Sequence, residues 1–407
     1  MSKLEELIEG LCPKGVEYKS VGSMITRIRE KGKIHPTIKQ VYVVSKTLGI
    51  VRSEDFHENE IHSEDTSNYT VIRHGMFAYN PSRLNIGSLG VLTLDTPGLV
   101  SPMYVVFTID ESKIIKEYLL YNLRSSLVKN KIDSLKEEGA RFRFDFERWD
   151  KINIPVPPLP VQREIVRILD NFTNLTAELT AELAARKTQY EYYLNYFINE
   201  NVRESDEYIK LGELFDFRNG LNKGKDFFGK GTPIIRYTDV YNKRFLHKED
   251  ITALVECNER ELEALQVSRG DVLFTRTSET AEEVGFSSVM LDDMDNCVFN
   301  GFTIKATPKT DKLLPNYCAY CFSTIAFRDY VTRRCTFTTR ASLTGKTLSE
   351  FLLVVPSIAN QKRIVSILDR FYSLCNDIYT GLPAEIEARQ KQYEYYRDKL
   401  LTFKELS

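Results

Sequence analysis

Residues 161–197 read VQREIVRILDNFTNLTAELTAELAARKTQYEYYLNYF. Apolar or aromatic side chains recur along this stretch at alternating steps of four and three residues, which places them on one face of a helix. Only Thr176 and Arg186 break this stripe, whose members are Ile165, Leu169, Phe172, Leu179, Leu183, Tyr190, Tyr193 and Phe197. A heptad stripe predicts a long helix, roughly 55 Å at about 1.5 Å per residue, that packs along one edge against a partner helix.

The chain contains a second copy of the stretch at residues 361–403, which read QKRIVSILDRFYSLCNDIYTGLPAEIEARQKQYEYYRDKLLTF. The strings ILD and ARxxQYEYY occur in both copies, and the stripe is repeated by Ile364, Leu368, Phe371, Ile386, Tyr393 and Tyr396. Identity extends to polar positions such as Gln189 and Gln392, which two unrelated amphipathic helices in separate cores would not require. The two copies are therefore expected to pack on each other.

The second copy holds four extra residues. Matching positions lie 199 residues apart at Gln162 and Gln361 but 203 apart at Gln189 and Gln392, and the insertion falls around residues 381–383 (Gly-Leu-Pro). A four-residue insertion locally unwinds a coiled coil, and glycine and proline interrupt a helix. We expect a break in the second helix at this place.

The segments that precede each helix are also duplicated. Residues 75–79 (GMFAY) match 270–274 (GDVLF), and the Val-Pro pair at 156–157 matches the one at 355–356. Runs rich in β-branched and aromatic residues predict short strands, for example at 41–45 (VYVVS), 90–94 (GVLTL) and 302–307 (FTIKAT). One helix is expected late in each globular segment, near 114–127 and near 315–332.

The predicted fold is α+β. It consists of two tandem mixed α/β domains joined by two long antiparallel coiled-coil helices, in an internal pseudo-twofold repeat. The expected boundaries are 1–156 for the first domain, 157–203 for the central helix, 204–355 for the second domain and 356–407 for the C-terminal helix.

The composition of the 407 residues, with 42% hydrophobic and 28% charged residues and a formal net charge of −2, is typical of a globular protein. No run approaches about eighteen apolar residues and the N-terminus is charged, so we expect neither a membrane span nor a secretory signal. The seven irregularly spaced cysteines predict reduced thiols. Cys318 and Cys321 form a single CxxC without a nearby histidine, which favours a pair in the core over a zinc site.

Two glycine-containing segments are locally basic and occupy the same relative place in both copies. Residues 24–46 carry six basic residues against one acid, and residues 218–248 carry eight against two. Lysine and arginine in such loops can reach phosphates and groove edges, although an ordinary solvated loop has the same composition. The repetition favours DNA, and the candidates are Lys31, Lys33, Arg218, Lys223 and Lys225.

Two other pairs of matching segments carry side chains suited to DNA. Residues 79–83 (YNPSR) and 274–278 (FTRTS) follow predicted strands with aromatic, hydroxyl and arginine side chains that suit base edges. Their candidates are Tyr79, Arg83, Arg276 and Thr277. The other pair supplies Arg141 in the first copy and Arg340 with Lys346 in the second, where an arginine that flanks the core is the alternative.

Signatures of catalysis are missing from the sequence. It contains no GxxxxGK[ST] loop, no HExxH and no glycine-rich cofactor loop between a strand and a helix, and its five histidines share no ligand spacing. Asn80-Pro81 lacks the second proline and the aromatic residue of an adenine-methyltransferase tetrad. We therefore expect a binding protein with no catalytic residue and no metal site.

The chain resembles the specificity subunit of type I restriction–modification enzymes over essentially its full length. The resemblance is carried by residues 157–172 (PPLPVQREIVRILDNF) and 356–371 (PSIANQKRIVSILDRF), and by the paired strings at 185–193 and 388–396. In that family two target-recognition domains each read one half of a split DNA sequence. The two helices form an antiparallel coiled coil that acts as a ruler, and the subunit itself is not catalytic.

The resemblance also implies partners. These are double-stranded DNA, two methyltransferase subunits and two restriction–translocase subunits, in the cytoplasm of a prokaryote. S-adenosylmethionine, ATP and Mg²⁺ are expected on the partner subunits and no cofactor on this chain, while the whole complex methylates the N6 atom of adenine or cuts DNA. Recognition domains diverge most in the family, so the resemblance transfers no base-contacting residue.

Two alternatives remain at this point. A single-chain DNA methyltransferase or nuclease would need the cofactor motifs that are missing, and a non-catalytic nucleic-acid-binding scaffold would lack a bipartite sequence preference. The tyrosine-rich helix ends bear on partner docking, because Tyr192 and Tyr395 lie off the stripe at matching positions and suit a protein interface. Plain coil surface is the alternative for these two side chains.

Overall fold

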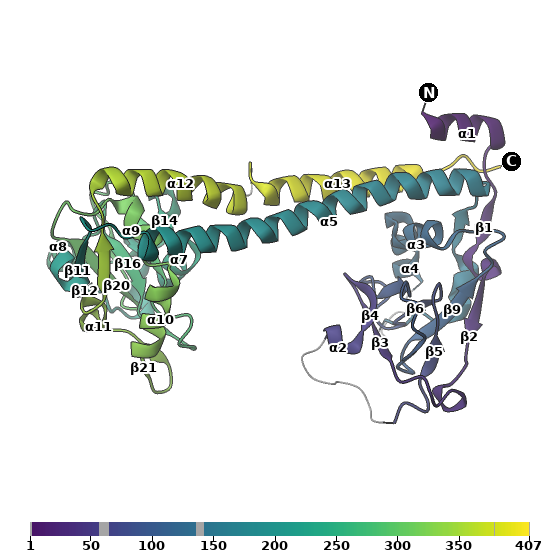
Figure 1. Cartoon of the computed structure of the whole chain (residues 1–407), viewed down its shortest axis with the longest axis horizontal. Coiled ribbons are helices and arrows are strands. Elements are labelled where there is room, and N and C mark those ends of the chain that lie inside the picture. Colours follow the sequence, from purple (N-terminus) through teal and green to yellow (C-terminus); the bar gives the residue numbers. More distant parts are fainter. Residues whose placement is uncertain (1, 57–64, 136–141, 378, 407) are drawn as a thin grey trace. The chain divides into compact units, whose positions relative to one another are not determined.

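The computed structural model describes residues 2–56, 65–135, 142–377 and 379–406. The chain divides into two compact units, with unit 1 formed by Met1–Leu179 and Ile386–Ser407 and unit 2 by Thr180–Glu385. The long helix α5 (Leu159–Asn195) begins in unit 1 and ends in unit 2, where a π-helical turn at Tyr196–Glu200 follows it (Figure 1). Each unit therefore combines one globular domain with helical segments from both copies of the repeat.

Unit 1 is built on two four-stranded sheets. The first is antiparallel, in the order β2 (Ile25–Ile28), β9 (Val105–Ile109), β6 (Phe77–Tyr79) and β7 (Leu89–Val91). The second is mixed, in the order β4 (Gly49–Arg52), β3 (Val41–Ser45), β8 (Gly98–Val100) and β5 (Thr70–Ile72). A separate antiparallel ribbon pairs β1 (Tyr18–Ser20) with β10 (Asn153–Pro155).

Unit 2 repeats this plan with additions. Its five-stranded sheet has the order β12 (Phe215–Asn219), β20 (Thr303–Pro308), β16 (Val272–Thr275), β18 (Ser287–Met290) and β14 (Phe245–Leu246). Two three-stranded sheets follow, β15 (Leu254–Val255), β13 (Phe228–Ile235) and β19 (Val298–Phe299), and then β17 (Thr277–Ser278), β22 (Ala341–Ser342) and β21 (Thr336–Phe337). The ribbon of β11 (Glu207–Lys210) with β23 (Leu352–Val355) matches that of β1 with β10. The predicted α+β fold with an internal repeat is confirmed.

Each globular segment has two late helices where we predicted one. Unit 1 contains α1 (Lys3–Leu11), α2 (Ser53–Phe56), α3 (Lys116–Arg124) and α4 (Ser126–Ser134). Unit 2 contains α6 (Leu211–Leu214), α7 (Tyr237–Asn242), α8 (Glu259–Leu265), α9 (Pro315–Cys321), α10 (Ile325–Arg334), α11 (Gly345–Ser349) and α12 (Ile358–Asn376). The single-helix predictions near 114–127 and 315–332 are wrong because Ser125 and Thr324 begin a new helix, their hydroxyls accepting from the backbone N–H of Val128 and Phe327.

The strand predictions hold unevenly. Residues 41–45 form β3 as predicted, whereas the strand predicted at 90–94 is β7 and ends at Val91. Its partner β6 supplies three residues, with Phe77 opposite Val91 and Tyr79 opposite Leu89, so the ladder stops there. Strand propensity alone does not locate the point where the partner strand ends.

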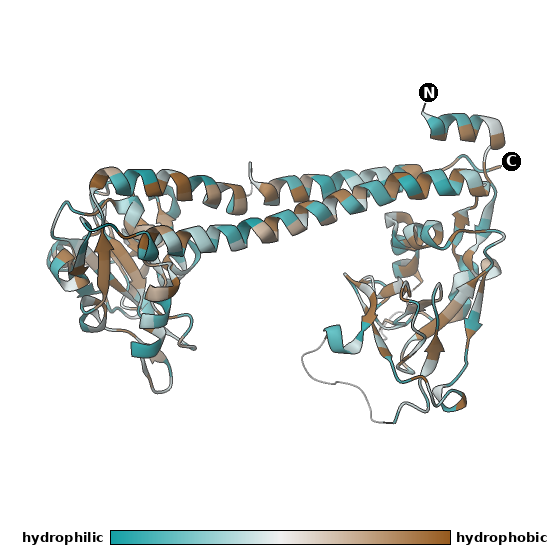
Figure 2. Ribbon diagram, in the orientation of Figure 1, coloured by the Kyte–Doolittle hydropathy of each residue, from teal (hydrophilic) through white to brown (hydrophobic). Residues whose placement is uncertain are grey.

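The stripe residues near the start of each long helix are part of the globular cores. Ile165 and Leu169 are fully buried in the core of unit 1 with Trp149, and Ile364 and Leu368 are buried in the core of unit 2. Figure 2 shows hydrophobic residues concentrated on the strands of unit 2 and alternating with hydrophilic ones along α5. Burial of this stripe is what fastens the helices to the domains.

The two copies of the helix pair with each other, as predicted. In unit 1 the rings of Phe172 and Tyr396 stack with centroids 5.5 Å apart, and in unit 2 Phe371 and Tyr193 stack at the same distance. These are equivalent pairs in the repeat. In unit 2 Tyr190 also lies 6.3 Å from Tyr372. Moving forward along α5 from Tyr190 to Tyr193 thus corresponds to moving back along α12 from Tyr372 to Phe371, which makes the pairing antiparallel.

The second helix is interrupted where the insertion predicted it. Helix α12 ends at Asn376, and α13 (Leu382–Leu400) begins after a short turn. The Asp377 carboxylate closes this turn by accepting hydrogen bonds from the backbone N–H groups of Tyr379 (2.7 Å) and Thr380 (3.1 Å). Pro383 lies in the first turn of α13, a place where the lack of an N–H costs nothing.

A buried glutamine anchors each long helix to its domain. Gln162 accepts a hydrogen bond from the backbone N–H of Ile115 (2.9 Å) and donates to the carbonyl oxygens of Lys113 (3.1 Å) and Pro157 (2.8 Å). Gln361 in unit 2 repeats all three bonds, with Leu314 N (2.9 Å), Lys312 O (2.7 Å) and Pro356 O (2.8 Å). Both side chains are fully buried.

The aspartate of the ILD string makes a second repeated contact. The hydroxyl of Tyr121 donates to Asp170 in unit 1, and that of Tyr320 donates to Asp369 in unit 2. We use the term docking contacts for these two Tyr–Asp bonds together with the glutamine bonds. They join the first turns of each long helix to the late helices of its own domain.

None of the helices in the described part of the chain combines the length and the apolar character needed to cross a membrane. Cys318 and Cys321 are both buried in α9, in agreement with the expected core pair. Burial raises the pKa of the Cys318 thiol to about 12.

Candidate nucleic-acid interface

Much of the basic charge predicted on residues 218–248 is neutralised inside unit 2. Lys223 forms an ion pair with Glu261 (2.8 Å) and its ammonium lies 4.8 Å from the centre of the Phe227 ring. Lys230 pairs with Glu256 at 2.9 Å. The pKa of Glu261 is lowered, chiefly by the bond from Lys223. These acids lie outside the counted segment, so the local charge count overstates the positive charge that DNA would meet.

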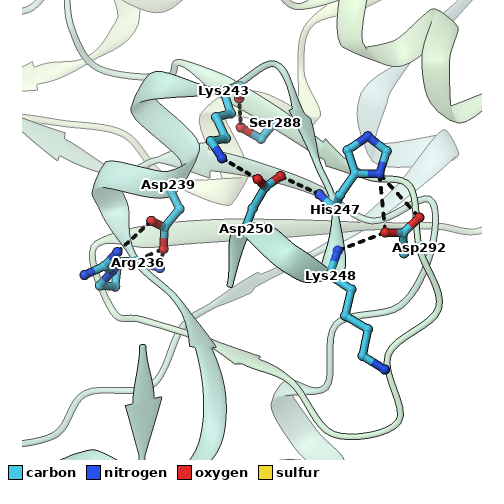
Figure 3. A network of polar contacts seen from close by, with 8 residues as sticks. All are labelled: Arg236, Asp239, Lys243, His247, Lys248, Asp250, Ser288 and Asp292. Atoms are coloured by element: carbon cyan, nitrogen blue, oxygen red, sulfur yellow. Dashed lines mark hydrogen bonds and ion pairs between the residues drawn. The ribbon is translucent and has the colours of Figure 1, made fainter. Parts of the chain in front are cut away.

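Figure 3 shows that acidic side chains also pair with basic ones at the C-terminal end of residues 218–248. Arg236 pairs with Asp239 (3.0 Å) and Lys243 pairs with Asp250. Asp292 accepts from the backbone N–H of Lys248 (2.8 Å), and this bond is the main reason why the pKa of Asp292 is lowered. Acidic side chains thus partner much of the basic charge at this end of the segment.

Other predicted residues of this segment remain accessible. Lys225 is exposed and forms no ion pair with any residue in the described ranges. Arg218 is exposed and donates to the carbonyl oxygen of Ala264 (2.8 Å). Arg218 also lines an open cavity of about 550 Å³ together with Lys346, so the fold brings together two candidates from distant parts of the sequence.

The basic segment of unit 1, residues 24–46, is more accessible to a DNA partner than the basic segment of unit 2. Lys33 is exposed, and the Lys31 ammonium donates to the carbonyl oxygen of Asn68 (3.0 Å) while lining a cavity of about 160 Å³. The only acid of this segment, Glu30, accepts two bonds from Arg73 (2.6 and 2.7 Å), which lower its pKa to about 2. Its charge is therefore matched by an arginine from outside the segment.

The prediction for Tyr79 is wrong. Its side chain is fully buried in the core of unit 1, where its hydroxyl donates to the carbonyl oxygen of Phe144 (3.2 Å) and burial raises its pKa. Three consecutive residues of β6 are all buried, because this strand lies between β7 and β9 and has both faces covered. Arg83, in the turn that follows, is exposed. Arg141 lies outside the described residues.

In unit 2 the fold brings two predicted regions together. Strand β17, with Thr277, pairs with β22, which pairs with β21 in the hairpin that contains Arg340. Thr277 and Arg340 both line an open cavity of about 420 Å³. The nearby Arg276 is half-buried and donates to the carbonyl oxygen of Gly301 (3.3 Å).

The sequence analysis missed three aromatic residues of this cavity. Tyr237 and Tyr241 stack with ring centroids 5.7 Å apart, and Phe302 is 54% exposed. The i, i+4 spacing of the two tyrosines on a short helix is the signal that could have identified them. Flat exposed rings of this kind suit contact with the apolar parts of bases.

A carboxylate is held ionised in the same cavity. Glu283 accepts hydrogen bonds from Ser278 Oγ (2.9 Å) and the Tyr241 hydroxyl (3.1 Å). These bonds, the one from Ser278 first, lower its pKa. In a DNA groove a carboxylate can accept from the amino group of cytosine, so the cavity offers base-edge chemistry in addition to positive charge.

Comparison with known proteins identifies the family to which the chain belongs. Residues 92–186 and 204–388 match the family model of the type I restriction modification DNA specificity domain. The chain belongs to the family of type I restriction–modification specificity subunits. A specificity subunit recognises the DNA target sequence and is the non-catalytic subunit of its enzyme.

Relatives support this membership along the whole specificity subunit. The chain is 30% identical to the EcoR124I/EcoR124II specificity subunit of Escherichia coli, over 99% of this chain and 97% of the relative. It is 26% identical to the EcoKI specificity subunit of Escherichia coli K12, over 66% of this chain and 61% of the relative.

Solved structures show the same fold. A chain from a study of complex assembly and conformational transition of the type I restriction–modification system matches with a TM-score of 0.66 and 17% identity, covering 96% of this chain and 98% of that one. The HsdS subunit from Thermoanaerobacter tengcongensis matches with a TM-score of 0.52 and 18% identity, covering 97% and 98%.

The helices of the specificity subunit present a second kind of surface. Tyr192 is 60% exposed and Tyr395 is 62% exposed, whereas Tyr190 and its counterpart Tyr393 pack toward the globular domains. Tyr192 stacks on Tyr196 with ring centroids 6.0 Å apart. Each unit thus carries an exposed tyrosine on its coiled-coil segment.

In the described ranges no three histidine, cysteine, aspartate or glutamate residues come together as metal ligands.

Proposed function

We propose that each globular domain of this specificity subunit reads one half of a bipartite DNA target and that the paired helices set the distance between the halves. The observation that carries the proposal is the duplication of the docking contacts. Gln162 and Gln361 make the same three bonds to equivalent backbone groups in two different domains. Repeated anchoring of two domains on one helix pair suits two readers held at a set spacing.

The candidate DNA surfaces are not duplicated in the same way, which supports two different half-sites. Unit 1 offers a basic loop in which Glu30 is matched by Arg73. Unit 2 offers the aromatic cavity that contains Tyr237 and Glu283. We assign the reading domains to residues 1–156 and 204–355. The proposed DNA contacts are Lys31, Lys33, Arg83, Arg218, Lys225, Arg276, Thr277, Arg340 and Lys346, with Lys223 in a minor role because of its ion pair.

The proposed partners are two methyltransferase subunits and two restriction–translocase subunits, which would carry S-adenosylmethionine, ATP and Mg²⁺. We place the methyltransferase contact on the helical segments 157–203 and 356–407. Exposed aromatic side chains at equivalent positions support quasi-symmetric docking of two copies, because aromatic residues are enriched in protein interfaces. The two exposed tyrosines are Tyr192 and Tyr395.

Replacing both Tyr192 and Tyr395 by serine should weaken association with the methyltransferase subunit by about tenfold or more, because buried tyrosines are frequent energetic centres of interfaces. The measurement is co-purification of the two subunits with titration of the affinity. Tyr208→Ser is the matched control, since Tyr208 is 63% exposed but lies on β11 rather than on one of the paired helices. Unchanged association of the double variant would assign both tyrosines to plain coil surface.

The proposed function is tested by sequencing adenine methylation genome-wide in a methylation-free host that expresses this chain with its cognate methyltransferase subunit. A single split motif with a fixed gap is the expected result. A short continuous motif would show that only one domain reads DNA. A stable complex that leaves the genome unmethylated would favour the scaffold interpretation.

A further inference from the structure

The β21–β22 hairpin is an exposed extension of unit 2. Strands Thr336–Phe337 and Ala341–Ser342 pair antiparallel, and the backbone N–H of Thr338 donates to the carbonyl oxygen of Arg340 (3.3 Å) to close the turn. Residues 336–340 are all exposed, and Phe337 is 59% exposed. Figure 1 shows the hairpin projecting from unit 2 on the side away from α12.

The sequence around the hairpin is basic, although the cavity that Arg340 lines also contains Glu279 and Glu283. Residues 330–349 contain no aspartate or glutamate, and their basic members are Arg333, Arg334, Arg340 and Lys346. The nearest acid in the sequence on the N-terminal side, Asp329, forms an ion pair with Arg333 at 3.5 Å. An exposed phenyl ring in a segment that carries several arginines suits an anionic partner with apolar groups within reach.

The base of the hairpin is anchored in the core of unit 2. Ala341 and Leu343 are buried in the core of unit 2. Strand β22 pairs with β17, and the backbone N–H of Leu343 donates to the carbonyl oxygen of Arg276 (2.8 Å). The tip is thus held in a set position relative to Thr277 and the aromatic cavity, as direct readout requires.

We propose that this hairpin enters the major groove of the half-site read by unit 2 and that Phe337 contacts the C5-methyl group of a thymine. The inference rests on the proposed function and goes beyond it by naming the reading element and the base. A two-stranded ribbon fits the major groove, which is about 12 Å wide, but not the minor groove at about 6 Å. The thymine methyl is the apolar group that the major groove displays.

The neighbouring side chains complete this assignment. Thr336, Thr338 and Thr339 carry methyl and hydroxyl groups that can share the contact with the thymine edge. Arg340 is exposed at the tip, and Arg333 and Arg334 are exposed at the end of α10, just before the hairpin. These arginines can reach the phosphates on either side of the groove. The arginines then orient the hairpin without selecting a base, and selection falls to Phe337.

The test uses the full chain in complex with its methyltransferase subunit and duplexes that contain the methylation motif. Each thymine of the unit 2 half-site is replaced in turn by deoxyuridine, which removes only the methyl group. At one position the wild-type complex should bind about fourfold more weakly, the effect expected for one buried methyl group. Phe337→Ala should bind the thymine duplex more weakly and should no longer distinguish it from the deoxyuridine duplex.

Two variants serve as matched controls. Tyr208→Ala removes another exposed ring of unit 2, one that does not line the aromatic cavity, and should keep the discrimination between thymine and deoxyuridine. Arg340→Gln should weaken binding to both duplexes equally and should lower the slope of log affinity against log salt by about 1, as expected for a phosphate contact.

The inference is overturned if Phe337→Ala still discriminates the two duplexes, or if no deoxyuridine in that half-site affects the wild type. An equal loss on both duplexes would identify Phe337 as a wedge between bases and would also overturn it. Failure of the proposed function can be distinguished from failure of this inference, because the wild-type complex would then show no bipartite methylation motif at all. Phe337 is mostly exposed, so its replacement leaves the core of unit 2 intact.

Discussion

Replacing Gln162 with methionine should lower the free energy of unfolding of unit 1 by roughly 4 kcal/mol, since each buried backbone group left without a partner costs about 1–3 kcal/mol. Three backbone groups lose their partner at once: the carbonyl oxygen of Pro157 in a buried bond, and the N–H of Ile115 and the carbonyl oxygen of Lys113 in partly buried ones. Methionine keeps the length of the side chain but offers no comparable hydrogen bond. A loss of this size is a large part of the stability of a typical domain, about 5–15 kcal/mol.

The measurement is urea unfolding followed by tryptophan fluorescence. Trp149 is the single tryptophan of the chain and is fully buried in unit 1, so its signal reports this unit. The midpoint of its transition should fall strongly in Gln162→Met. A midpoint equal to that of the wild type would show that the buried glutamine does not stabilise the junction.

The repeat provides a matched control. Gln361→Met removes the equivalent three bonds from unit 2 and should leave the Trp149 midpoint close to that of the wild type. The effect of Gln361→Met should appear instead in the circular dichroism, where the helical signal should be lost at a lower urea concentration than in the wild type. Equal shifts of the Trp149 transition in both variants would mean that the two units unfold as one.

Inserting one heptad into each of the two paired helices should lengthen the gap in the methylated DNA motif by about three base pairs and leave both half-sites unchanged. Seven helical residues add about 10 Å, and B-DNA rises about 3.4 Å per base pair. A whole heptad keeps the stripe in register. The insertions belong after Leu179 in α5 and after Glu385 in α13, where the two units meet in the sequence.

Sequencing of adenine methylation in a methylation-free host measures the gap directly. A heptad in α5 alone is the control, because it displaces one helix relative to its partner and should abolish a defined motif. If a half-site sequence changes, or if the gap stays constant after the double insertion, the helices do not act as the ruler.

The features that the sequence determined by itself are those that repeat or follow a helical period. The stripe from Ile165 to Phe197 predicted α5 and its partner, and the displaced register between the two copies located the break before Leu382. Heptad periodicity reflects which face of one helix is buried, so it is legible without knowing the rest of the fold.

The position of charge and the candidate site were decided only by the tertiary structure. Lys223 is basic in any count along the chain, but the fold places Glu261 beside it. Tyr79 resembles an exposed aromatic residue after a strand, yet both faces of its strand are covered. Thr277 and Arg340 meet through strands β17 and β22. Ion pairs, burial and strand pairing join residues that are distant in sequence, so no local window contains the information that determines them.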